Sequence, residues 1–340
     1  MTPTPRVRPG VRLGAGAEFD LIRALLGESG EPAEGVLVGP GDDCAILDPA
    51  GSPWAVTVDM SVEGVHFRRA WIELQEIGWR AAATAISDLA AVAAQPVALL
   101  LSMALTDEDA REGTPALLQR GAAEAAAFVG ASIVGGDLVR SPGPLTLDVV
   151  ALGRVGHPLL REGARAGGEL WVTGSLGGAG AAVAAWTAGR EPTAAHRRAF
   201  ARPEPRVKEA LWLAQTGHVR ALIDLSDGLA GDAGHLAAAS GCGVVLFGAH
   251  IPVAEGVVDV AGGRAEAVRL ALTAGEDYEL CFASEEGAIE SFRAEFEQRF
   301  GLALTLVGRF VDGTGVVLDS GAGAPGLLRG GYSHFGREPA

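Results

Sequence analysis

The sequence predicts an α/β protein with two domains. Its 340 residues are more than one small hydrophobic core usually organises. Hydrophobic residues make up 48% of the chain, and their spacing alternates between the repeats of strands and of helices. A stretch rich in glycine and arginine, residues 156–168, separates two halves of similar size. We therefore expect an N-terminal domain over 17–155 and a C-terminal α/β domain over 156–340, after a disordered start at 1–16.

The first half alternates helices and strands. A short amphipathic helix is expected over 17–27, closed by Gly27. Pro96 should end a long helix, because proline disrupts helical hydrogen bonding. Asp107 is a candidate N-cap for a second long helix. After the first helix, the expected elements are a strand at 54–59, helix 71–95, strand 97–105, helix 107–129, and strands at 132–136 and 145–155.

The second half continues the alternation with shorter elements. In chain order we expect strand 169–174, a helix from about 177, helix 206–215, strand 220–226, helix 228–240, strand 243–247, helix 264–271, strand 278–282, helix 285–299 and strand 302–310.

The charge balance limits the possible partners. The chain carries 42 acidic and 27 basic residues, a net charge of −15, and Lys208 is its only lysine. Sequence-independent nucleic-acid binding depends on cationic contacts to phosphates, so we expect no nucleic-acid partner. No GxxxxGK[ST] motif occurs, which excludes a P-loop nucleotide site.

Cysteine usage and hydropathy indicate a soluble cytoplasmic protein. The three cysteines show no CxxC spacing, which argues against a disulfide framework and a structural zinc site; they are Cys44, Cys242 and Cys281. The start of the sequence lacks the apolar core of a signal peptide. The most apolar stretch, 89–105, is interrupted at Pro96, which indicates a helix end and a buried strand rather than a membrane span.

Acidic residues recur where strands end and helices begin. Each has a structural alternative: Asp59 or Asp137 could terminate a strand, and Asp227 could cap a helix. The adjacent pair Asp42 and Asp43 could form a turn or bind a cation. The set also includes Asp224, Glu276 and Asp277.

Asp88 is the hardest of these residues to explain structurally. It lies among alanine, isoleucine and leucine in "AISDLAAVAAQP". A lone buried charge is costly, so this carboxylate should be paired or bound to a metal. Five or six carboxylates at element ends suggest magnesium, which takes oxygen ligands from carboxylates and from substrate phosphates.

Seven motifs in order resemble the thiamine-monophosphate kinases, which share their fold with aminoimidazole ribonucleotide synthetase. The resemblance extends from about Glu18 to Phe335. The motifs are "GPGDDCAIL", "TVDMSVEGVHF", "ISDLAAVAAQP", "GGDLVR", "DLSDGLAGDAGHL", "GEDYELCF" and "GYSHF".

The resemblance implies ATP-dependent phosphorylation of thiamine monophosphate to thiamine diphosphate, by direct in-line transfer with several Mg²⁺ ions. It also implies a homodimer whose N-terminal sheets join, and no protein general base. The implied magnesium ligands are Asp43, Thr57, Asp59, Asp88, Asp137, Asp224 and Asp227, with Asp42 behind them or in a turn. The implied ATP contacts are Gly136, Asp137, Arg161 and Ser226, and the implied thiamine-substrate contacts are His66, Glu276 and Tyr332.

Two positions depart from the family pattern. Val58 stands where a second hydroxyl residue is common, so a metal contact there would use the Val58 carbonyl or be lost. Ala274 replaces a glycine and would be strained if that position needs a positive φ.

The sequence lacks the features that are typical of other enzymes with this fold. No cysteine precedes Cys44 as a selenophosphate synthetase would need, the sequence does not end in the cysteine of a hydrogenase-maturation relative, and "VEGVHF" replaces the "DGVGTK" of the synthetase. The alternatives are another ATP-dependent enzyme of this fold, or a non-catalytic metal-binding relative.

Overall fold

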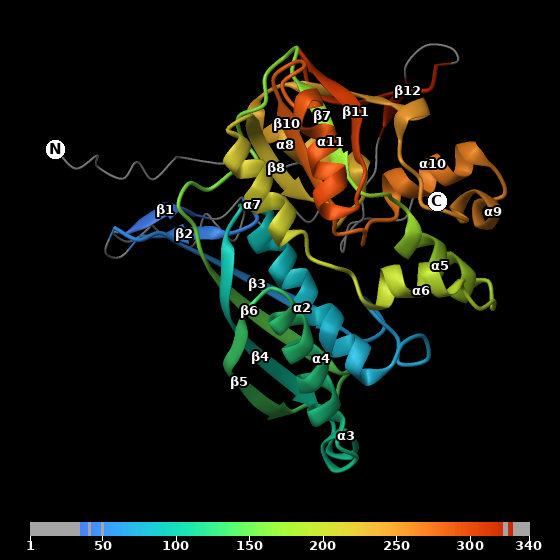
Figure 1. The fold of residues 1–340 in the computed structure, drawn as a ribbon. Coiled ribbons are helices and arrows are strands. Elements are labelled where there is room, and N and C mark those ends of the chain that lie inside the picture. The colour runs from blue at the N-terminus through green and yellow to red at the C-terminus, as the bar shows by residue number, and fades with distance from the viewer. Residues whose placement is uncertain (1–34, 40–41, 49–50, 322–325, 329–340) are drawn as a thin grey trace.

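The computed structural model describes residues 35–39, 42–48, 51–321 and 326–328. Within these ranges the chain forms two lobes, each built on one β-sheet with helices packed against it (Figure 1). The expected disordered start, the helix at 17–27 and Tyr332 lie outside the described residues. The boundary that we place at Gly156 falls in the connection between the last strand of the first sheet and the first strand of the second.

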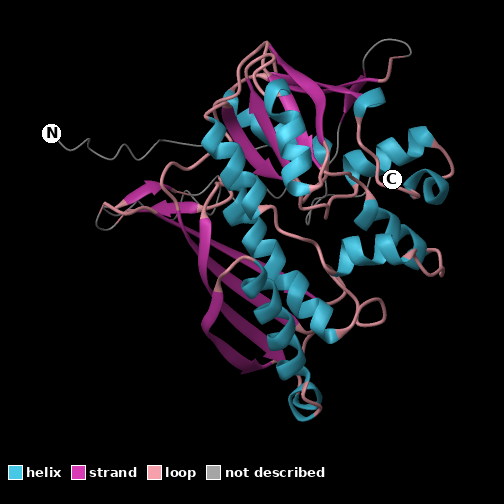
Figure 2. Cartoon of the chain, viewed as in Figure 1, coloured by secondary structure: helices cyan, strands magenta, loops and turns pink. Residues whose placement is uncertain are grey.

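The N-terminal lobe contains a six-stranded sheet in the order β1-β2-β3-β6-β4-β5. Only the pair β4–β5 is parallel. Helices α2 and α4 cover one face of the sheet and pack against each other (Figure 2). The elements are β1 (Val36–Val38), β2 (Ala45–Leu47), β3 (Trp54–Val62), α2 (Leu74–Ala91), β4 (Gln95–Leu105), α3 (Asp107–Arg111), α4 (Thr114–Phe128), β5 (Ser132–Arg140) and β6 (Thr146–Arg154).

The C-terminal lobe contains a seven-stranded sheet in the order β13-β12-β9-β11-β7-β10-β8. Its internal strand β7 is buried along its whole length, as expected for a strand covered on both faces. The elements are β7 (Glu169–Thr173), α5 (Gly178–Thr187), α6 (Ala194–Ala201), α7 (Val207–Thr216), β8 (Val219–Asp224), α8 (Leu229–Ser240), β9 (Gly243–Phe247), the 3-10 turn η1 (Gly248–His250), α9 (Val257–Ala261), α10 (Arg264–Thr273), β10 (Leu280–Ser284), α11 (Glu290–Phe300), β11 (Leu304–Val311), β12 (Gly315–Asp319) and β13 (Gly326–Leu328).

The expected helix over 107–129 is wrong in two respects. Gly113 adopts a left-handed φ of 79° and divides the segment into α3 and α4. The N-cap of α3 is Thr106 rather than Asp107. The Thr106 hydroxyl accepts from the Asp109 N–H at 3.2 Å, and the Asp109 carboxylate accepts from the Thr106 N–H, which completes a capping box. Asp107 is the first residue of the helix.

Other boundaries also differ from expectation. Helix α2 ends at Ala91, and Pro96 lies inside β4, so proline does not end the helix. Helix α11 starts at Glu290, five residues after the expected position, and α6 was not foreseen. No helix among the described residues is long and apolar enough to cross a membrane. All three cysteines are buried free thiols.

Two glycines allow α2 and α4 to approach closely. A Cβ added at Gly121 would lie 1.8 Å from the Gln75 carbonyl oxygen, and one added at Gly78 would lie 2.0 Å from that of Leu118. Both obstacles are backbone atoms, which cannot rotate away. This contact supports α2, which also contributes residues to the cavity between the lobes.

We predict that Gly121→Ala destabilises the protein, although alanine usually favours a helix over glycine by ~1 kcal/mol. The helices must separate to accept the methyl group, at a cost of roughly 1–3 kcal/mol. Gly234→Ala in α8 is the matched control, because its Cβ would meet only the tip of the Val316 side chain at 3.1 Å. Thermal unfolding of both variants tests this, and equal midpoints would contradict it.

Candidate active site

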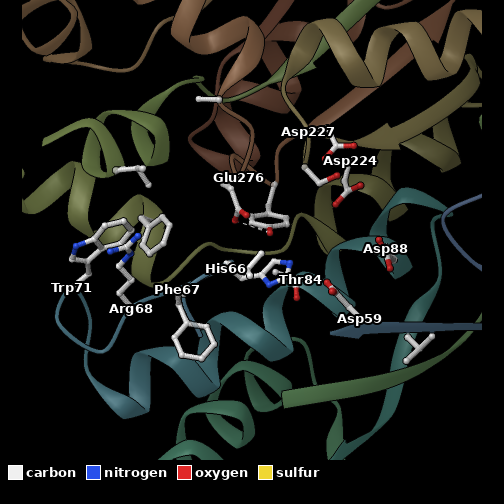
Figure 3. Close-up of a pocket in the computed structure, with 18 residues that line it drawn as sticks. Asp59, His66, Phe67, Arg68, Trp71, Thr84, Asp88, Asp224, Asp227 and Glu276 are labelled. Carbon is white, nitrogen blue, oxygen red and sulfur yellow. Dashed lines mark hydrogen bonds between the residues drawn. The ribbon is translucent and has the colours of Figure 1, made fainter. Parts of the chain in front are cut away.

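A cavity of about 480 Å³ lies between the two lobes. The cavity is lined by strand β3 and the loop after it, by helices α2, α5 and α6, and by the turns that follow β8 and precede β10 (Figure 3). Carboxylates gather at one end, and Trp71 and Arg68 stand at the other. The Arg68 guanidinium lies 5.0 Å from the centre of the Trp71 ring, and the Phe200 ring packs edge-on against Trp71. The cavity therefore offers both a place for cations and phosphates and an aromatic wall.

Three carboxylates from distant segments meet at the acidic end. Asp43 precedes β2, Asp88 lies on α2, and Asp224 ends β8. Each offers an oxygen atom, and these atoms lie within 4.8 Å of one another. Asp59 and Asp227 line the same cavity.

Hydroxyl groups orient two of these carboxylates. Thr57 Oγ donates to Asp88 Oδ2 at 2.5 Å, and Ser87 Oγ donates to Asp224 Oδ2 at 2.5 Å. Thr57 and Ser87 are both buried. In this structure Thr57 therefore contacts the cluster through Asp88.

Burial and mutual repulsion make these acids hard to ionise. Burial, and then the neighbouring Asp43, raise the pKa of Asp224 to about 7. Burial and the charges of Asp224, Asp43 and Asp59 raise the pKa of Asp88 well above its usual value. Burial and Asp43 raise the pKa of Asp42 to about 7.

One guanidinium compensates part of this charge. Arg161 Nε and Nη2 donate to the two carboxylate oxygens of Asp43, each at 2.9 Å, and the Arg161 backbone N–H donates to Asp42 Oδ2 at 3.0 Å. Among the described residues it is the only arginine or lysine that forms an ion pair with the cluster. Converging, under-compensated carboxylates with a nearby hydroxyl are the ligand set that magnesium prefers, so the site fits that ion.

A second group lies beside the first. Asp227, Asp232 and His235 also place ligand atoms within 4.8 Å of one another. The Asp227 N–H donates to Asp232 Oδ2 at 3.2 Å, so Asp232 holds the turn that carries Asp227. Burial and Arg161 lower the pKa of His235 to about 4, which keeps its imidazole neutral.

His66 lines the cavity from the loop after β3. Its Nδ1 accepts the Val62 N–H at 3.0 Å. In the neutral ring the proton therefore lies on Nε2, which makes that atom a hydrogen-bond donor. This geometry suits a residue that binds an acceptor group.

Glu276 stands on a strained turn. Glu276 and Tyr278 have φ values of 68° and 50°, which cost of order 1–3 kcal/mol each in non-glycine residues. Hydrogen bonds from their N–H groups to Ser226 O at 2.8 Å and Leu225 O at 2.9 Å hold the turn against β8. Ala274 has a φ of −79°, so the strain expected at that position does not occur. It is Gly275 that needs a positive φ of 68°, and a Cβ there would lie 2.2 Å from Ser226 O.

The remaining predicted positions divide into two groups. Ser226 lines the cavity. Gly136 and Asp137 lie on the edge strand β5 and are not among the described residues that line the cavity, and Asp137 Oδ1 accepts the N–H of Leu138. Val58 also lines the cavity, although its side chain is largely exposed.

Comparison with known proteins assigns the family. Residues 41–155 match the family described as AIR synthase related protein, N-terminal domain, and residues 165–320 match its C-terminal domain. A protein of Rhodopirellula baltica named thiamine-monophosphate kinase is 37% identical over 293 residues, which cover 83% of this chain and 85% of that protein. The chain belongs to the thiamine-monophosphate kinase family.

Solved structures of thiamine-monophosphate kinases share the fold. The enzyme from Stenotrophomonas maltophilia is 34% identical, with a TM-score of 0.73 over 90% of this chain and 97% of that one. A structure titled "AaThiL complexed with AMPPCP and TMP" is 26% identical, with a TM-score of 0.78 over 97% of this chain and all of the other. The expected two-domain synthetase-like fold is therefore confirmed.

Sequence reasoning missed residues that support the site. Arg80 and Tyr278 both contact Glu276, and Trp71 stacks on Trp186 with ring centroids 5.2 Å apart. Arg80 carried a usable signal, because it is a lone charge in an apolar helix segment, as Asp88 is. The ion pair between Arg161 and Asp43 joins positions 118 residues apart and left no local signal.

We predict that the metal-free protein becomes less stable between pH 6.5 and pH 8. A raised carboxyl pKa means that the folded state holds more protons than the unfolded state, so the stability is lost as pH rises through about 7. The lowered pKa of His235 has the opposite effect on stability, and this effect fades as the pH rises above the ordinary histidine pKa of 6.5. Thermal midpoints in a chelator should be higher at pH 6.5 than at pH 8, and magnesium should reduce the difference. A midpoint that rises with pH in the chelator would contradict this explanation.

We predict that Asp88→Asn raises the thermal midpoint in a chelator and nearly abolishes the stabilisation by magnesium. The amide keeps the size of the side chain, accepts from Thr57, and removes one of the repelling charges. The exposed Asp259→Asn is the control and should respond to magnesium as the wild type does. A loss of stability together with an unchanged magnesium response would show that Asp88 has a structural role instead.

Proposed function

We propose that this protein phosphorylates thiamine monophosphate with ATP and yields thiamine diphosphate. The observation that carries the proposal is the cavity itself, with converging carboxylates at one end and an aromatic wall at the other. Family membership supports it, and so does the likeness to a structure whose title names an ATP analogue and TMP.

Magnesium ions held by the acidic cluster would screen phosphate charge during an in-line transfer. We assign Asp43, Asp88 and Asp224 as the central ligands. Asp59, Asp227 and Asp137 are further proposed ligands, with Thr57 orienting Asp88. Gly136, Asp137, Arg161 and Ser226 remain proposed ATP contacts, and His66, Glu276 and Tyr332 remain proposed contacts for the thiamine substrate.

No protein general base is needed in this reaction. The acceptor is a phosphate monoester whose second pKa is near 6, so it is mostly dianionic and nucleophilic at neutral pH. The protein's task is to bind the two anions and align them while it compensates their repulsion. Arg161 is suited to this work, because its guanidinium already lies against the cluster.

The test is an assay with ATP and magnesium plus thiamine monophosphate, thiamine or neither, in which ADP and thiamine diphosphate are measured. ADP release that depends on thiamine monophosphate and matches thiamine diphosphate formation is the expected result. Metal-dependent binding without turnover would instead support a non-catalytic relative, and turnover without thiamine diphosphate would support another enzyme of this fold.

We predict that His66→Gln raises the KM for thiamine monophosphate more than it lowers kcat. His66 would donate from Nε2 to bind the substrate and would not move a proton, and kcat should rise through about pH 6 with ionisation of the acceptor. Both constants are measured at saturating ATP and magnesium. A fall in kcat of several hundredfold at an unchanged KM would mean that His66 performs proton chemistry.

We also propose a cytoplasmic homodimer formed through the N-terminal sheets. The N-terminal sheet exposes large apolar side chains on two of its strands: Val58 and Met60 on β3, and Val134, Leu138 and Val139 on β5. Several exposed large apolar side chains on one sheet usually mark an interaction surface.

We predict that Val134→Asp lowers the solution mass from that of a dimer toward that of a monomer. A charge at this 65% exposed position would be buried without a partner in the interface. Val258→Asp, at an exposed apolar position in the other lobe, should leave the mass unchanged. Light scattering at micromolar concentration measures both, and a monomeric wild type would contradict the dimer.

A further inference from the structure

Arg80 is a buried cation at the seam between the lobes. It lies on α2, and only 3% of it is exposed. Its Nη1 donates to the Phe200 carbonyl of α6 at 2.6 Å, and its guanidinium carbon lies 4.1 Å from the centre of the Phe200 ring. Its Nη2 pairs with Glu276 Oε2. The Phe200 carbonyl and the Phe200 ring therefore fix the position of the guanidinium, in addition to its ion pair with Glu276.

Tyr278 holds the same carboxylate oxygen from the other side. Its hydroxyl donates to Glu276 Oε2 at 2.9 Å, within the turn of positive φ values (Figure 3). Both donors therefore use Oε2, and no described residue donates a hydrogen bond to Oε1. Because Glu276 lines the cavity, Oε1 is the oxygen that can accept from a ligand.

The chemistry of the ligand decides what this oxygen can recognise. In thiamine monophosphate the N–H donors are confined to the amino group of the aminopyrimidine ring. An ionised carboxylate is acceptor-only, and a hydrogen bond to it is stronger than one between neutral groups.

We propose that Arg80 and Tyr278 are positioning residues that hold Glu276, so that Oε1 accepts a hydrogen bond from the ring amino group of the substrate. This inference rests on the proposed function and names the residues that make the site selective for an aminopyrimidine. Its alternative is that Arg80 only joins the two lobes, in which case its loss would not depend on the substrate's amino group.

The experiment compares thiamine monophosphate with the analogue in which hydrogen replaces that amino group. KM and kcat are measured for both acceptors in the wild type, Tyr278→Phe, Arg80→Met and Arg80→Lys. Tyr278→Phe removes one oxygen atom and is the variant least able to disturb the fold. Arg202→Met is the matched control: Arg202 also lies 4.1 Å above an aromatic ring, that of Trp79, and pairs with Glu124, but it does not line this cavity.

We expect Tyr278→Phe and Arg80→Met to raise the KM for thiamine monophosphate about tenfold, the effect of a weakened charge-assisted hydrogen bond. The KM for the analogue and kcat should change little. Arg80→Lys should recover part of the loss, and Arg202→Met should match the wild type. KM values that rise in parallel for the two acceptors, or not at all, would overturn the inference while leaving the proposed function intact. A wild type that does not phosphorylate thiamine monophosphate would overturn both.

Discussion

Repulsion among buried carboxylates is the constraint on which the rest of this site depends. Asp43, Asp88 and Asp224 come within 4.8 Å of one another, and Arg161 alone pairs with the cluster among the described residues. Such a cluster destabilises the empty protein unless protons or cations compensate it. This destabilising cluster lies at the junction of the two lobes. A cation bound there stabilises the folded state and prepares the cavity for phosphates.

The two lobes are joined by the same groups that line the cavity. Asp88 from α2 meets Asp224 from β8 at the acidic end, while Arg80 from α2 meets Phe200 and Glu276 at the other. Each end therefore combines an N-terminal element with C-terminal ones. The same side chains line the cavity and join the two lobes. A substitution among them should therefore affect both substrate binding and the packing of the lobes.

The sequence predicted the fold class and most strands, because apolar periodicity and glycine positions are local signals. The sequence-based prediction failed where tertiary contacts determine the ends of the elements. Gly113 divides a segment whose apolar periodicity predicts one continuous helix, and Pro96 lies within a strand rather than at a helix end. At the site, Asp88 could be predicted as a candidate metal ligand, because a lone buried charge is costly. The same reasoning would have found Arg80. The pairing of Arg161 with Asp43 depends on the folding together of distant segments, and no periodicity or motif encodes it.

Calorimetric titration of the protein with magnesium tests the central claim most directly. The titration is repeated in two buffers of different ionisation enthalpy, at pH 6.5 and at pH 8.5. Because burial and repulsion raise the pKa of Asp42 and of Asp224 to about 7, magnesium should displace protons at the lower pH. We predict proton release at pH 6.5, and less release at pH 8.5, where Asp42 and Asp224 are already ionised. Magnesium binding without proton release at pH 6.5, or no binding at either pH, would contradict the assignment of this cluster as the cation site.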